Sequence, residues 1–144
     1  EKLIAKEHKK YYLQTMDIKH SDDGKKGKFY IEQDGEQLAE MTYVWAGNKF
    51  IIDHTEVSDR LAGKGIGKQL VQKAVEFANN LRKNIENLKI EHKYSSVSSY
   101  ITASMGLICK NANEIVIDEI YKQADDLLYQ AKRSGRNQVK VNED

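Results

Sequence analysis

The sequence predicts an α/β fold with a mixed sheet, in which an antiparallel meander is followed by a βαβαβ-like half with helices packed on the sheet. Three observations predict it. The runs FYIEQ, EQLAEMTYVW and KFIIDHTEV, within residues 29–57, are rich in strand-forming side chains. Two segments, 66–88 and 117–131, repeat apolar residues every three or four positions, as helices do. The runs YITASMGLIC (100–109) and NQVKV (137–141) are predicted strands that alternate with these helices.

The turns of the meander are also visible in the sequence. Asp34-Gly35 separates the first two runs and is a strong hairpin signal, because both residue types tolerate a positive φ. Ala46-Gly47-Asn48 predicts the next turn. Residues 19–28 are polar and contain glycine, so they are predicted to form a loop. Residues 1–15 predict a short amphipathic helix, and Gly135 is a candidate cap for the last helix.

Composition limits the function classes. A chain of 144 residues is expected to form one domain, divided here into 1–15, 16–78 and 79–144. Its net charge of +1 indicates neither a nucleic-acid partner nor a membrane surface. A mean hydropathy of -0.70 without a long apolar run excludes a membrane span. The charged N-terminal stretch predicts no signal peptide, and the single cysteine, Cys109, favours a reducing cytoplasm.

The clearest chemical feature is a glycine-rich turn between the third predicted strand and the long helix. Closely spaced glycines allow the backbone to approach a ligand, and the start of a helix favours an anion. The pattern is not a Walker loop, because GK[ST] is missing, and it lacks the spacing of the dinucleotide fingerprint. A ligandless strand-to-helix connection is the competing interpretation. The residues predicted to bind phosphate are Arg60, Leu61, Gly63, Lys64, Gly65, Ile66, Gly67 and Lys68.

This segment resembles a known family. IDHTEVSDRLAGKGIGKQLVQKAVEFA is similar to the acetyl-CoA motif R-x-x-G-x-G of small GNAT-type (Gcn5-related) N-acetyltransferases, and the resemblance covers residues 16–78. It implies that backbone N–H groups from Leu61 to Lys68 hold the pyrophosphate of CoA. The cysteine- and proline-containing segment that follows in such enzymes is absent, since the chain has no proline.

The later part resembles a different family. Residues 80–141 are similar to the C-terminal half of a GGDEF diguanylate cyclase domain, through the signature A-D-x-x-L-Y-x-A-K-x-x-G-R-N. The resemblance implies that Lys132 and Arg136 lie near a triphosphate, whereas favourable charge at a helix C-terminus is the simpler explanation. The GG[DE]EF hairpin is missing, so neither cyclase activity nor binding of cyclic di-GMP is expected. We interpret the chain as a chimera of equivalent halves, and favour an engineered origin.

The remaining candidates are less specific. The four histidines show no metal-ligand spacing, so no metal is predicted. His54 and Glu56 are candidate bases for an acceptor amine, although surface roles are favoured for them. Three functions compete: a CoA-binding chimera with weak or no acetyl transfer, a module that is folded but binds no ligand, and a working acetyltransferase. The first ranks slightly above the second, and both rank above the third.

Overall fold

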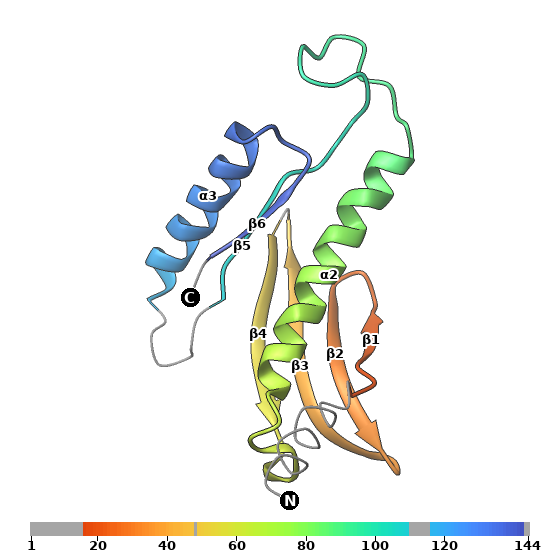
Figure 1. Cartoon of the computed structure of the whole chain (residues 1–144), viewed down its shortest axis with the longest axis vertical. Helices are drawn as coiled ribbons and strands as arrows, with labels where there is room; N and C mark the ends of the chain where they lie inside the picture. Colours follow the sequence, from red (N-terminus) through yellow and green to blue (C-terminus); the bar gives the residue numbers. More distant parts are fainter. Residues whose placement is uncertain (1–15, 48, 110–115, 143–144) are drawn as a thin grey trace, which may run out of the picture. The chain divides into compact units, whose positions relative to one another are not determined.

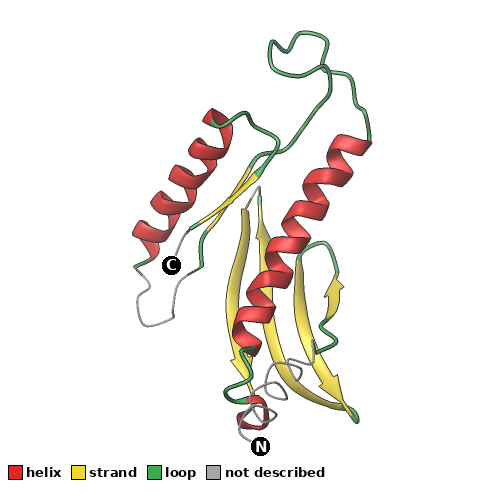
Figure 2. Cartoon of the chain, in the orientation of Figure 1, coloured by secondary structure: helices red, strands yellow, loops and turns green. Residues whose placement is uncertain are grey.

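The computed structural model describes residues 16–47, 49–109 and 116–142, so the predicted helix at 1–15 lies outside the described residues. The chain divides into two compact units, residues 1–73 and 74–144. Both units combine strands with helix, which confirms the mixed α/β class (Figure 2). The prediction that the whole chain is a single domain stays a prediction. No helix in the described part of the chain is long and apolar enough to cross a membrane.

The first unit is built on a four-stranded antiparallel sheet in the order β1-β2-β3-β4. Asp34 and Gly35 have φ values of 52° and 78°, which suit the tight turn of the β2–β3 hairpin and confirm the prediction made there. The parallel strands of the second unit form a separate sheet instead of extending this one. The four strands are β1 (Lys19–Asp22), β2 (Lys26–Gln33), β3 (Glu36–Ala46) and β4 (Lys49–Val57).

The loop predicted at residues 19–28 is wrong. This stretch contains β1, the turn and the start of β2, with Lys19 opposite Tyr30. All four residues of β1 are exposed, so the strand has no alternation of apolar and polar side chains by which it could have been found. Carboxylates close its turn, because Asp22 accepts from the Gly24 N–H at 2.6 Å and Asp23 accepts from the Lys26 N–H at 2.8 Å.

The core of the first unit is formed by the sheet and the start of α2 (Ile66–Asn87), whose residues up to Lys73 belong to this unit (Figure 1). Alternate β3 residues point to this face, so Ala39, Met41 and Tyr43 are buried while Glu40 and Thr42 point to the other side. A short 3₁₀ turn, η1 (Asp59–Leu61), joins β4 to the segment before α2. The other buried apolar residues of this unit are Phe29, Ile31, Leu38, Leu61, Ile66 and Leu70.

The second unit contains the rest of α2, then β5 (Met105–Leu107), α3 (Ile117–Arg133) and β6 (Val139–Val141). β5 and β6 pair in parallel, and α3 packs on both. The buried strand predicted at 100–109 is therefore wrong in extent, since β5 has three residues of intermediate burial. Gly106 has no room for a side chain, because an added Cβ would lie 2.5 Å from both the Ala124 carbonyl oxygen and the Leu128 nitrogen.

The predicted cap at Gly135 is confirmed. Gly135 has a φ of 111° and directly follows Ser134, the C-cap residue of α3. The next N–H, from Arg136, donates to the Ala131 carbonyl at 3.0 Å, which is the six-to-one bond of a Schellman motif. The side-chain amide of Gln138 also donates to Ala131 at 3.2 Å, so the end of the helix is held from two sides.

Candidate functional site

The glycine-rich turn belongs entirely to the first unit and is ordered by its own backbone. Ser58 begins η1, and its Oγ accepts from the Arg60 N–H at 3.3 Å. The Leu61 N–H donates to the Ser58 carbonyl at 2.8 Å, and the Lys64 N–H donates to the Leu61 carbonyl at 3.3 Å. Leu61 itself is buried, so its side chain anchors the turn to the core.

Three N–H groups that can meet an anion are those at the start of α2. The carbonyl of Gly65 accepts from the Gln69 N–H at 3.1 Å, which places Gly65 at the cap position of the helix. The first N–H groups of a helix have no partner within the helix. Those of Ile66, Gly67 and Lys68 stand in this position, and the positive end of the helix dipole adds to their attraction for an anion.

The three glycines leave the space beside this backbone open. Gly63 and Gly65 have φ values of 71° and 68°, a region where other residues are strained. Gly67 lies within α2, where no such backbone requirement applies. An added Cβ at any of the three would meet no atom within 4 Å in the described part of the chain. A ligand can thus come close to the backbone at all three positions.

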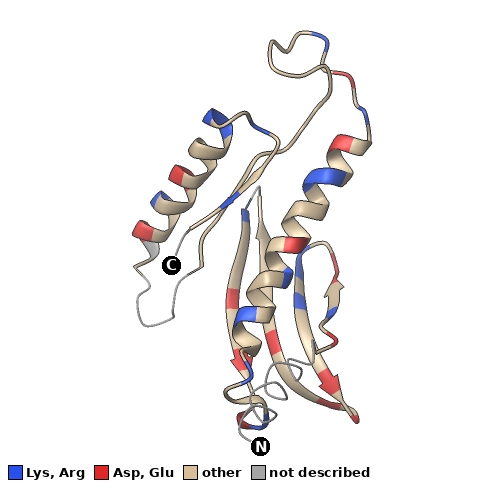
Figure 3. Cartoon of the chain, in the orientation of Figure 1, with Lys and Arg blue, Asp and Glu red and all other residues tan. Residues whose placement is uncertain are grey.

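Basic residues occur along the turn and at the start of α2 (Figure 3). Lys64 and Lys68 are exposed on either side of the first helical residue. Arg60 is also exposed, and its Nη1 contacts Glu36 Oε2 at 2.5 Å, at the start of β3. In this structure the Arg60 guanidinium thus connects the turn to the β2–β3 hairpin. Lys64 and Lys68 are closer in sequence than Arg60 to Ile66, the first residue of α2.

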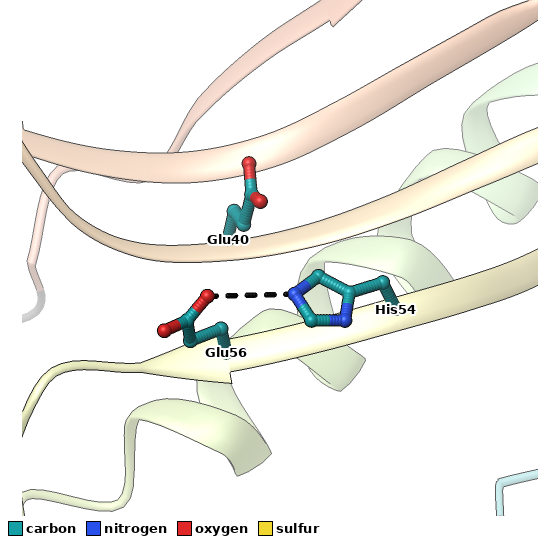
Figure 4. Close-up of side chains that lie close together, drawn as sticks. All are labelled: Glu40, His54 and Glu56. Atoms are coloured by element: carbon teal, nitrogen blue, oxygen red, sulfur yellow. Dashed lines mark ion pairs between the residues drawn. The ribbon is translucent and has the colours of Figure 1, made fainter.

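The two candidate bases lie on the exposed face of the sheet, together with a residue that the sequence did not single out. His54 Nε2 is 3.5 Å from Glu56 Oε2, since residues two apart on a strand share one face (Figure 4). Glu40 of β3 is directly opposite Glu56 of β4. Its proximity depends on strand register, which the linear sequence does not reveal.

A second polar cluster, also missed from the sequence, surrounds Tyr43. Gly27 of β2 lets the Tyr43 ring reach β1, because a Cβ at Gly27 would lie 2.3 Å from the Tyr43 hydroxyl. That hydroxyl donates to Asp22 Oδ2 at 2.5 Å and contacts His20 Nε2 at 2.7 Å. Trp45 donates to the same carboxylate at 3.0 Å. Asp22 is thus an exposed carboxylate that accepts hydrogen bonds from two aromatic side chains of β3.

This cluster shifts the titration of its members. The hydrogen bond from Tyr43, followed by those from the Gly24 N–H and the Trp45 indole, lowers the pKa of Asp22, because each favours the charged carboxylate. Burial, together with the bond to Asp22, raises the pKa of Tyr43. Tyr43 thus stays protonated at neutral pH and acts as a hydrogen-bond donor that fastens β1 to the sheet.

Lys132 and Arg136 lie in the second unit, at the end of α3. Both are exposed. Arg136 and Asn137 have left-handed backbones, with φ values of 59° and 47°. The Asn137 side-chain oxygen accepts from Arg82 Nη1 at 2.9 Å, so the turn after α3 is tied to α2 within this unit. The phosphate-binding role implied for Lys132 and Arg136 stays a prediction.

Two comparisons with known proteins bear on these sites. Residues 28–89 match the model of the family described as GCN5-related N-acetyl-transferase. The match begins in β2, includes the glycine-rich turn and runs through all of α2. It confirms the first of the two resemblances predicted from the sequence, and it continues past the predicted boundary at residue 78.

The chain is also similar to diguanylate cyclases. A probable diguanylate cyclase of Escherichia coli K12, DgcT, is 33% identical over 86 residues, which cover 57% of this chain and 19% of that protein. The diguanylate cyclase VdcA of Vibrio cholerae is 39% identical over 67 residues, covering 46% of this chain and 20% of that protein. The chain thus spans about a fifth of the length of these relatives. The second predicted resemblance is confirmed.

Proposed function

We propose that the turn from Arg60 to Lys68 binds the pyrophosphate of acetyl-CoA, in a recombined chain that has weak or no acetyl transfer and no diguanylate cyclase activity. The N–H groups of Ile66, Gly67 and Lys68 would donate to the phosphate oxygens, and Lys64 and Lys68 would supply charge. We also propose that the protein is located in the cytoplasm, where CoA is present.

The observation that carries the proposal is Gly67. Glycine costs up to about 1 kcal/mol relative to alanine in a helix interior, and it is a poor helix former in the first turn of α2 as well. Gly67 has neither a positive φ nor a neighbour within 4 Å of an added Cβ among the described residues, so the packing of the first unit does not require it. A ligand lying against the first helical turn supplies the missing reason, because a side chain at that position would occupy its space.

The second unit gives no comparable support for cyclase chemistry. The signature residues Gly135 and Asn137 have structural roles in ending α3 and holding Arg82. The 144 residues contain no GG[DE]EF segment. We therefore propose that this chain, taken by itself, does not condense GTP.

Calorimetric titration of acetyl-CoA into the full chain tests the proposal. We expect a micromolar dissociation constant, and we expect Gly67→Glu to weaken binding at least tenfold because its carboxylate repels the pyrophosphate. The same substitution should not destabilise the protein, since an acidic residue in the first turn suits the helix dipole. Gln72→Glu adds the same charge to an exposed position on the same helix and should bind like the parent chain.

The alternatives appear as other outcomes of this titration. Absence of heat and of a thermal shift at millimolar acetyl-CoA, with the protein folded, would reject the proposal and leave a chimera that folds without a ligand. Binding that is equal in the parent chain and in Gly67→Glu would place the ligand elsewhere.

The contact between His54 and Glu56 is the one observation that favours a working acetyltransferase. An imidazole beside a carboxylate can accept a proton from an amine. If this pair is the base, release of CoA thiol from acetyl-CoA in the presence of small amines should be measurable and should fall at least tenfold in His54→Gln. A rate that is the same in both proteins would leave CoA binding as the whole function.

A further inference from the structure

Three potential metal ligands lie close together on the exposed face of the first sheet, and none of them belongs to the glycine-rich turn. Glu40 comes from β3, and His54 and Glu56 come from β4 (Figure 4). Each offers one ligand atom, and these atoms all lie within 4.8 Å of one another. We propose that Glu40, His54 and Glu56 form a binding site for a divalent transition-metal ion such as Zn²⁺.

The charges on this face need a cation. Glu40 and Glu56 are directly opposite each other on neighbouring strands, and like charges in that arrangement destabilise a sheet. Lys28 offsets Glu40 only in part, at 3.6 Å from its Oε2. Glu56 has the His54 ring at 3.5 Å, which is a neutral ligand unless it is protonated. A bound ion would neutralise both carboxylates at once.

The donor set selects the kind of ion. Calcium and magnesium take oxygen ligands, so the imidazole of His54 disfavours them. One nitrogen and two carboxylate oxygens suit zinc, which binds His nitrogen and Asp or Glu oxygen at about 2.0–2.2 Å. Three protein ligands would leave at least one position for water, as in open zinc sites.

The geometry requires only small side-chain movements. Two ligand atoms of one zinc ion lie at most about 4.4 Å apart, slightly less than the limit of 4.8 Å that the group meets here. The side chains of His54 and Glu56 are 54% and 74% exposed, so they can turn toward each other without disturbing the core. Glu40 is more restricted, because Gln37 Nε2 donates to its Oε2 at 2.8 Å. That bond orients the carboxylate as outer contacts do for metal ligands.

Zinc titration of the full, metal-free chain is the direct test. We expect one zinc ion per chain with micromolar affinity by calorimetry, and at least a tenfold weaker affinity in both His54→Ala and Glu56→Gln. Glu32→Gln removes the same charge from an exposed residue of the same sheet and should leave the affinity unchanged. His20→Ala, His92→Ala and Cys109→Ser should also leave it unchanged, which excludes the other histidines and the cysteine of the described chain as ligands.

Lys28→Gln should change the zinc affinity in the opposite direction from His54→Ala and Glu56→Gln. Removing the ammonium group near Glu40 should tighten zinc binding severalfold, whereas a site elsewhere would not respond. In the parent chain, zinc should selectively shift the NMR signals of the His54 ring, which tests the site without any substitution. Zinc binding that survives His54→Ala, or no binding at 100 µM zinc (roughly a hundredfold above a micromolar constant), would overturn the proposal.

The site shares no residue with the glycine-rich turn, so each can fail alone. Acetyl-CoA titration of His54→Ala should match the parent chain if the cofactor lies at the turn. Zinc titration of Gly67→Glu should likewise match the parent chain. If His54 also serves as the proton acceptor in acetyl transfer, zinc should inhibit that transfer, because the same ring nitrogen cannot hold both.

Discussion

Leu70 of the first unit is completely buried, whereas Leu88, the residue directly after the same helix, is 66% exposed. The contrast extends to both units. The first buries large aromatic and aliphatic side chains, while the buried apolar residues of the second that the structure describes are three alanines, Ala74, Ala78 and Ala131. The large apolar side chains that are exposed in the described chain all follow residue 87, and Tyr94 is fully exposed.

This difference reflects the number of layers that each unit can assemble. A four-stranded sheet covered by a helix closes around a core, whereas two strands and one packed helix can bury little. The comparison teaches that two units of nearly equal length in one chain can bury very different amounts of apolar side chain.

The largest change in the free energy of unfolding is expected from Leu70→Ala, and the same substitution at Leu88 in the second unit is the comparison. Leu70→Ala should reduce the free energy of unfolding by about 3 kcal/mol, because it empties a buried site. Leu88→Ala should change it by less than about 0.5 kcal/mol. Urea denaturation followed by fluorescence of Trp45, the single tryptophan, measures the first unit directly. Equal effects of the two substitutions would remove the contrast between the units.

Gly106→Ala should destabilise the second unit by about 2 kcal/mol, because the added methyl group collides with the backbone of α3. Amide hydrogen exchange should increase in β5, β6 and α3. Gly67→Ala is the matched control, since its methyl group enters open space and should stabilise α2 by up to about 1 kcal/mol. If Gly106→Ala lowers the free energy of unfolding reported by Trp45 as much as that reported by hydrogen exchange in the second unit, the two units unfold as one domain.

Asn142→Ala should cost about 1 kcal/mol in the second unit. The Asn142 side chain accepts from the Cys109 N–H at 2.7 Å and donates to the Cys109 carbonyl at 2.9 Å, so it continues the β5–β6 pairing beyond the last strand residue. Exchange of the Cys109 amide proton is the sensitive measurement. Gln123→Ala, on the exposed face of α3, should leave that rate unchanged.

The smallest effect is an acid sensitivity confined to the first unit. The pKa of Asp22 is lower in the folded chain than its ordinary value of 3.8. Its contribution to stability is therefore present above about pH 4 and is lost as the pH falls through the folded pKa. Urea denaturation followed by circular dichroism should show that Asp22→Asn differs most from the parent chain at pH 7 and least near pH 2. A stability difference between Asp22→Asn and the parent chain that stays constant across this pH range would show that Asp22 does not cause the acid sensitivity.

Much of the first unit could be predicted from local signals. Asp34-Gly35 carries its own turn preference, and the apolar spacing from Ile66 to Ala78 defines one face of a helix whatever the rest of the chain does. The strand β1 could not be predicted, because its four exposed residues are held by pairing with β2 and by bonds to Tyr43. The role of Gly27 also depends on Tyr43, the residue directly opposite it on the neighbouring strand β3.

The sequence by itself determined the mixed α/β class, the two resemblances, and the position of the glycine-rich turn at the start of a helix, because motifs and periodicity are properties of neighbouring residues. Only the tertiary structure decided which N–H groups of that turn remain for a ligand, that Arg60 pairs with Glu36, and that Glu40 joins His54 and Glu56. The last of these facts depends on strand register, which brings residues more than ten positions apart to adjacent places on one sheet.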